Sequence, residues 1–144
     1  MISIFDLANT FLAFDIMTHK KLQKLCYYAY SWYLVKYKTP LINNKFEAWR
    51  HGPVCDDLYQ RYKDYGNRPI CSSNDIPINV KKNKEVLDFI NKIYEIYGKY
   101  DADKLEKLTH SEDPWKLTRI GLSDNASCRR VITDQSIINY YSNL

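Results

Sequence analysis

Phe46-Glu-Ala-Trp-Arg-His-Gly-Pro-Val-Cys-Asp-Asp-Leu-Tyr-Gln-Arg-Tyr62 is the stretch that decides the fold, because its pattern changes at the centre. Side chains over residues 46–51 point alternately to two sides if the backbone is extended, as in a strand. Gly52 and Pro53 then form a turn signal, because Gly tolerates positive φ and Pro fixes φ at about −65°. Apolar residues beyond the turn recur at three- and four-residue steps, which is typical of a helix. The stretch therefore predicts a short strand, a tight corner and a helix.

The corner over residues 49–54 has a structural interpretation. We expect Trp49 to fill the core and Gly52 to supply a backbone geometry that Ala would not adopt. Pro53 is expected to begin the following helix at its first position. Arg50 or His51 would then hold the corner closed through hydrogen bonds to backbone carbonyls.

A catalytic alternative for the same corner rests on His51 and Cys55, since a Cys beside a His can act as an activated nucleophile. Such a site also needs an orienting third group and an oxyanion site, and the sequence shows neither. We therefore favour the structural interpretation and predict that the chain is not an enzyme.

Length and composition indicate one ordinary folded domain over residues 1–144. The chain is 45% apolar, carries 13 Tyr and 3 Trp, and has a net charge of +4. Residues 18–68 hold ten Lys and Arg against four Asp and Glu, so the positive charge is concentrated there. Nucleic-acid modules also interleave basic and aromatic residues. Here the aromatic residues fall on apolar helical stripes, and no DNA-binding motif is present, so DNA binding is the weaker hypothesis.

The four cysteines Cys26, Cys55, Cys71 and Cys128 lack the paired spacing of a zinc site. We expect no disulfide framework, no cofactor and a reducing, cytoplasmic environment. The sequence shows no signal peptide and no stretch near the roughly 20 apolar residues of a membrane span.

The remaining elements are predominantly helical by periodicity and capping signals. Short strands are expected within 41–52, at 76–80 as an edge piece because of Pro77, and at 131–132. Helices are expected over 2–16, 19–37, 83–97, 101–108, 114–120 and 134–142, with Ser3, Thr18, Asn83, Asp101, Asp113 and Thr133 as N-caps. These elements predict an α+β fold, mainly α-helical, in which a compact bundle of about five to six helices carries a small two- or three-stranded sheet.

Residues 109–115 form a second polar corner. His110, Glu112 and Asp113 offer three types of metal ligand, but their spacing fits no standard site, so we predict no metal. If this corner meets the first one in space, His110 or Glu112 could pair with Arg50 or His51. A buried charged pair of this kind would fix one geometry rather than add much stability.

Three motifs in order resemble one known family: Lys21-Leu-Gln-Lys-Leu-Cys-Tyr-Tyr-Ala29, Glu47-Ala-Trp-Arg-His-Gly-Pro-Val54 with Tyr59 downstream, and Leu108-Thr-His-Ser-Glu-Asp-Pro-Trp115. The chain is similar to the Panacea domain family, the SocA-like antitoxins, and to GepA-like phage-associated proteins. This resemblance covers roughly residues 4–143, and three ordered motifs are far more specific than one.

The resemblance implies a mainly helical fold and the antitoxin half of a toxin–antitoxin system, of the kind that prophages and other mobile genetic elements carry. Members neutralise different toxins mostly by direct protein–protein binding. One branch instead acts as an adaptor that delivers its toxin to a AAA+ protease. A DNA-binding repressor of its own operon is a third alternative, and a homo-oligomer stays open.

The partner is expected at polar and amphipathic residues around the two corners and the basic start of the 19–37 helix. The candidates for contact are Lys20, Lys21, His51, Tyr59, Arg61, His110 and Glu112. The residues expected to hold the motifs together are Trp49, Gly52, Pro53, Asp113, Pro114 and Trp115. The rival hypothesis places the toxin on the loop over 66–80, since loops on a rigid scaffold often carry specificity.

Overall fold

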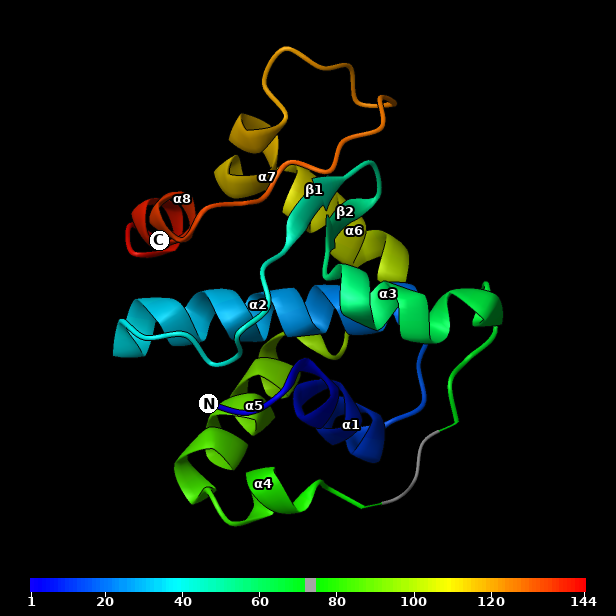
Figure 1. Cartoon of the computed structure of the whole chain (residues 1–144), viewed down its shortest axis with the longest axis vertical. Coiled ribbons are helices and arrows are strands. Elements are labelled where there is room, and N and C mark those ends of the chain that lie inside the picture. The colour runs from blue at the N-terminus through cyan, green and yellow to red at the C-terminus, as the bar shows by residue number, and fades with distance from the viewer. Residues whose placement is uncertain (72–74) are drawn as a thin grey trace.

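The computed structural model describes residues 1–71 and 75–144, and it has the expected mainly helical α+β architecture. Figure 1 shows α2 crossing the middle of the molecule, with α1, α4 and α5 on one side and the hairpin, α6, α7 and α8 on the other. The elements in chain order are α1 (Ile4–Phe14), α2 (His19–Tyr37), β1 (Glu47–Trp49), β2 (Gly52–Val54), α3 (Asp56–Tyr62), the 3₁₀ turn η1 (Lys63–Tyr65), α4 (Ile78–Lys81), α5 (Lys84–Tyr97), α6 (Ala102–His110), α7 (Asp113–Thr118) and α8 (Asp134–Tyr141).

The central helix α2 has the predicted bounds. Its N-cap Thr18 accepts a hydrogen bond from the backbone N–H of Lys21, which satisfies one of the free donors of the first turn. Every residue from 22 to 31 is buried, so this helix is covered on all sides rather than along one stripe. Gln23 and Lys24, which the periodicity places on an exposed face, are 2% and 1% exposed. The hairpin and α6 cover that face, and this contact decides the geometry of the functional site.

The hairpin is a two-stranded antiparallel sheet in which Glu47 pairs with Val54 and Trp49 with Gly52. The expected strand at 131–132 is only an isolated bridge, between Glu47 and Val131. The Ile132 N–H donates to the Phe46 carbonyl at 2.8 Å, which ties the segment before α8 to the outer side of β1.

Four predictions about individual elements need correction. Residues 78–81 form helix α4 and not a strand, and Pro77 occupies the N-cap position of that helix. Pro53 lies in β2, and α3 begins only at Asp56, after the N-cap Cys55. Glu112 and not Asp113 occupies the N-cap position of α7, so Asp113 is the first helical residue. The helices also exceed the expected five to six, since the described residues contain eight, of which α4 is a single turn.

The other predicted caps are present. Ser3 and Asp6 form a reciprocal capping box at α1, and the side chains of Asn83, Asp101 and Thr133 each accept a hydrogen bond from the first turn of α5, α6 and α8. Within the described part of the chain, every helix is too short or too polar to serve as a membrane span.

Candidate functional site

The two polar corners meet in space, as the sequence suggested, but through residues other than those expected to pair. The indole Nε1 of Trp115 donates to the Trp49 carbonyl at 2.8 Å. The guanidinium of Arg119, only 3% exposed, donates from Nη1 to the Ala48 carbonyl at 2.8 Å. Because both donors satisfy backbone acceptors of β1, α7 and the turn after it hold the hairpin in a fixed position.

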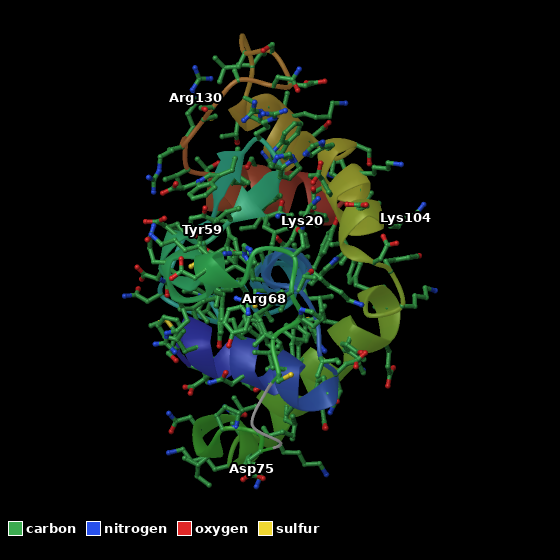
Figure 2. The ribbon with its side chains drawn as sticks, turned by 90° about the vertical axis from the view of Figure 1, so that its right-hand side faces the viewer. Lys20, Tyr59, Arg68, Asp75, Lys104 and Arg130 are labelled. Carbon is green, nitrogen blue, oxygen red and sulfur yellow. The ribbon has the colours of Figure 1, made fainter. Side chains whose placement is uncertain are left out.

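A pocket of about 470 Å³ lies between the hairpin, the start of α2 and the α3–η1 segment. Trp49 forms one wall and is half-buried there rather than filling the core. The Trp49 ring meets the ring of Tyr59 edge to face, with centroids 4.9 Å apart. The Tyr59 ring in turn lies beside the His19 ring, with centroids 6.0 Å apart. Figure 2 looks toward the N-terminal end of α2, with Lys20 between the hairpin and α6 and Tyr59 on the α3 side.

Lys24 lines this pocket from the α2 side. Its side chain passes under the corner, and Nζ donates to the Pro53 carbonyl at 3.2 Å. Burial, the largest cause, and the neighbouring Lys20 charge together lower the pKa of Lys24 to about 7, although Glu106 acts in the opposite direction. A lysine with these surroundings changes its protonation state near neutral pH, whereas an exposed lysine stays protonated there.

Gly52 makes room for this lysine. Its φ is +111°, a conformation that side chains rarely adopt, and a Cβ there would lie 2.6 Å from Cε of Lys24 and 3.1 Å from Oγ1 of Thr109. The reason for a glycine at this corner is therefore twofold: the backbone conformation and the passage of Lys24 beneath it.

Gln23 attaches α2 to the start of α3. Its Nε2 donates to the Cys55 carbonyl and its Oε1 accepts from the Cys55 N–H, both at 2.9 Å. These two buried hydrogen bonds give partners to both the N–H and the carbonyl of Cys55, the N-cap residue of α3, whose side chain makes no capping bond. Gln23 and Lys24 therefore set the distance between α2 and the corner from two adjacent positions.

Glu106 of α6 joins two of the predicted partner-binding residues. Lys20 Nζ lies 2.5 Å from Glu106 Oε1, and His51 Nδ1 lies 3.4 Å from the same oxygen. Burial alone would lower the pKa of Lys20, but Glu106 and Asp103 outweigh it and raise that pKa. Burial alone would likewise raise the pKa of Glu106, but Lys20 and His51 lower it. Glu106 thus holds the α2 end of the pocket to the hairpin.

The other candidate residues lie around this centre rather than within it. Lys21 Nζ donates to the Gly98 carbonyl at 2.6 Å, on the side of α2 that faces the end of α5. The guanidinium of Arg61 stacks over the Phe5 ring of α1 at 3.9 Å. His110 is half-buried and stacks on Trp115, with ring centroids 3.8 Å apart.

Glu112 lies in the interior, so we do not retain it in a contact surface. It is 7% exposed, and its Oε1 accepts hydrogen bonds from Tyr28 at 2.7 Å and Tyr141 at 2.9 Å. The Tyr141 hydroxyl oxygen also lies 3.1 Å from the Tyr27 hydroxyl, and it accepts there because its one proton goes to Glu112. Burial raises the pKa of Glu112, although the two hydroxyl donors act in the opposite direction. This network connects α2, α7 and α8 in place of the expected pair with Arg50 or His51.

Within the described residues, neither the His51–Cys55 pair nor the second corner has the geometry of a catalytic or metal site. Cys55 is buried, and burial raises the pKa of its thiol, so the reactive thiolate is disfavoured. Around the second corner, His110 stacks on Trp115 while Glu112 faces the interior tyrosines. Among the described residues, no three His, Cys, Asp or Glu side chains gather at a point that could hold a metal ion.

Gln23, Glu106 and Arg119 were not predicted to act in this site, and Lys24 was expected on the exposed basic face of its helix rather than in the interior. Gln23 and Lys24 belong to the first motif, Lys21–Ala29, but the helical period indicates only that they share a polar face. Glu106 and Arg119 lie outside all three motifs. No local pattern marks them, because each acts on a segment more than 50 residues away along the chain.

Comparison with known proteins identifies the class to which this fold and site belong. Residues 22–116, which include both corners and the buried residues Gln23 and Lys24, match the family described as antitoxin SocA-like, Panacea domain. The chain belongs to this family. It is 29% identical over 139 residues to Antitoxin SocA of Caulobacter vibrioides, with 85% of this chain and 74% of that protein covered. No solved structure matches the chain.

Proposed function

We propose that this chain is the antitoxin of a toxin–antitoxin pair and that it neutralises its cognate toxin by direct, stoichiometric protein–protein binding. The observation that carries the proposal is family membership over residues 22–116. The described site adds indirect support, because its buried polar groups are used to fix the hairpin rather than to arrange a nucleophile and a base. We accordingly propose a non-catalytic role.

We propose that the toxin contacts the corner face, defined as Lys20, Trp49, Arg50, His51 and Tyr59. Arg50 and His51 are exposed at the tip of the hairpin, and the other three are half-buried around the pocket. Aromatic and arginine side chains are enriched where protein interfaces gain most of their energy. The hairpin is held by Trp115, Arg119 and Gln23, so these side chains are presented on a rigid support, which lowers the entropic cost of binding.

The test of neutralisation is co-expression with the protein encoded by the neighbouring reading frame. Binding predicts that growth is restored and that the two proteins co-purify in a fixed ratio. Rescue at strongly substoichiometric amounts, without a complex, would count against binding and favour an enzyme. Loss of the toxin in cells that depends on a AAA+ protease would instead identify an adaptor, and a shift of operon DNA in a gel would identify a repressor.

The corner face is tested against the rival loop over 66–80, of which residues 72–74 lie outside the described part. Arg50→Glu combined with His51→Ala should abolish toxin binding while the melting temperature stays nearly unchanged, because both side chains are exposed and an exposed pair such as His51–Glu106 adds little stability. Lys92→Glu is the matched control, since Lys92 is exposed on α5, away from the hairpin. If the double variant still neutralises the toxin and a swap of 66–80 does not, the contact surface is the loop.

We also propose that the protein acts in the cytoplasm. Cys26, Cys55, Cys71 and Cys128 are all free thiols, and three of them are buried. Free thiols persist where the surroundings are reducing. Fractionation of cells that carry a tagged chain would test this location.

A further inference from the structure

The charged side chains that line the pocket beneath the hairpin are all positive. Lys20, Lys24, Arg50 and Lys63 contribute cationic side chains to it, and among the described lining residues none is Asp or Glu. Glu106 lies beyond one wall, where it is already engaged with Lys20 and His51. A cleft that concentrates one charge at low-dielectric walls attracts ions of the opposite sign.

Lys24 gives this pocket a buried polar anchor. Its side chain is 1% exposed, and within the described residues its Nζ donates one hydrogen bond, to the Pro53 carbonyl. An ammonium group carries three N–H donors, so two of them remain for another acceptor. A buried charge that is not hydrogen-bonded to a counter-charge is costly, and a ligand anion that reaches Nζ would reduce that cost. The neutral backbone carbonyl of Pro53 cannot do so.

The walls add a second recognition element. Trp49 and Tyr59 present aromatic surface to the pocket, and Arg50 and Lys63 lie at its edge on exposed parts of the chain. A volume of about 470 Å³ falls within the range of small-molecule sites, which combine apolar walls with few polar anchors. The dimensions therefore suit a small molecule with one anionic group and one planar portion.

We propose that this pocket binds a small organic anion, whose phosphate or carboxylate group accepts hydrogen bonds from Lys24 while its planar portion packs against Trp49 and Tyr59. The anion would be a ligand of the antitoxin chain itself, held in the pocket that the corner face surrounds. This inference needs no toxin, so its outcome and that of the proposed function are distinguishable.

The experiment is isothermal titration calorimetry on the full chain with two matched pairs of probes. AMP is compared with adenosine, and indole-3-acetate with indole; within each pair only the first carries the anionic group. Inorganic phosphate alone is a fifth titration. Binding of AMP identifies a phosphate site, and binding of indole-3-acetate identifies a carboxylate site. In either case the uncharged counterpart should bind about 10- to 100-fold more weakly, the range that a hydrogen bond to a charged group supplies.

Lys24→Met is the decisive variant, because it keeps the unbranched chain and removes the ammonium group. It should weaken binding of the anionic probe about 10- to 100-fold, and Arg50→Ala, an exposed change that does not touch the interior, should also weaken it. Lys81→Met is the control, since Lys81 is exposed on α4, and it should bind as the wild type does. The proposal is overturned if no anionic probe binds, if the uncharged counterparts bind equally well, or if folded Lys24→Met retains the wild-type affinity.

Discussion

Replacing Lys24 by Met should change how the stability of this protein depends on pH. Lys24 is 1% exposed, and burial together with the nearby Lys20 charge lowers its pKa from 10.5 to about 7. In the unfolded chain the same side chain is solvated and regains its ordinary pKa. Between pH 7 and pH 10 the unfolded state therefore binds more protons than the folded state does. The free energy of unfolding must then rise with pH over this window, and Lys24 lowers stability most as the pH falls toward 7.

The magnitude follows from the difference between the two pKa values. Each unit of pKa difference corresponds to about 1.4 kcal/mol, so holding Lys24 in the interior costs about 4 kcal/mol at pH 7. At pH 9 the cost falls to about 2 kcal/mol, because less free energy is needed to deprotonate the side chain. Met does not titrate. The difference in unfolding free energy between Lys24→Met and the wild type should therefore shrink by about 2 kcal/mol from pH 7 to pH 9.

The charged and titratable groups around Lys24 do not obscure this difference. Lys20 has a raised pKa and stays charged over the window, and Glu106 has a lowered pKa and stays ionised. His19 and His110 both have lowered pKa values, mainly because they are partly buried, so they stay neutral. None of the four gains or loses a proton between pH 7 and pH 9.

Urea unfolding followed by tryptophan fluorescence at several pH values gives the required free energies. Lys81→Met should keep the wild-type pH slope, since Lys81 is exposed and its removal deletes a charge without touching the interior. Parallel pH profiles for the wild type and Lys24→Met would refute the reasoning, because they would mean that Lys24 keeps an ordinary pKa in the folded state. The absolute stability of Lys24→Met is a weaker test, because this variant also leaves the Pro53 carbonyl without its donor.

Gly52→Ala should lower the free energy of unfolding by more than Gly121→Ala does, as chemical denaturation would measure. Both glycines have positive φ, which costs about 1–3 kcal/mol for another residue, but only at Gly52 would a Cβ meet Lys24 at 2.6 Å. Equal losses would show that Lys24 moves aside without cost. Tyr141→Phe should lower stability by about 1–3 kcal/mol, because it removes a buried hydroxyl that donates to Glu112. Tyr140→Phe, next to it and less buried, is the control, and equal effects of the two changes would argue against the Glu112 network.

Much of the secondary structure was predictable because its signals are local. The N-caps Ser3, Thr18, Asn83, Asp101 and Thr133 each bond to a backbone N–H three residues onward, so the sequence within one turn is sufficient to place them. Helical periodicity likewise predicted residues 19–37 as one helix, and the mainly helical fold class follows from such segments taken together.

Local signals were ambiguous where two interpretations share the same residues. Ile76, Ile78 and Val80 alternate as in a strand, yet the chain forms a helical turn over Ile78–Lys81. Val80 packs in the core from that turn, so burial of one side chain prevailed over a weak alternation. At the second corner, Asp113 followed by Pro114 resembles an N-cap, but Glu112 takes that position and its carboxylate turns to the interior tyrosines.

The sequence by itself determined the long helices, five of their starting caps, the sharp corner at Gly52 and the three motifs that mark the family. Only the tertiary structure decided that Lys24 is buried beneath that corner, that Trp49 lines a pocket, and that Glu106 joins Lys20 to His51. The physical reason is that burial and charge pairing depend on which distant segments approach one another. A helical period records the side of the helix on which a side chain lies, but not which segment covers that side.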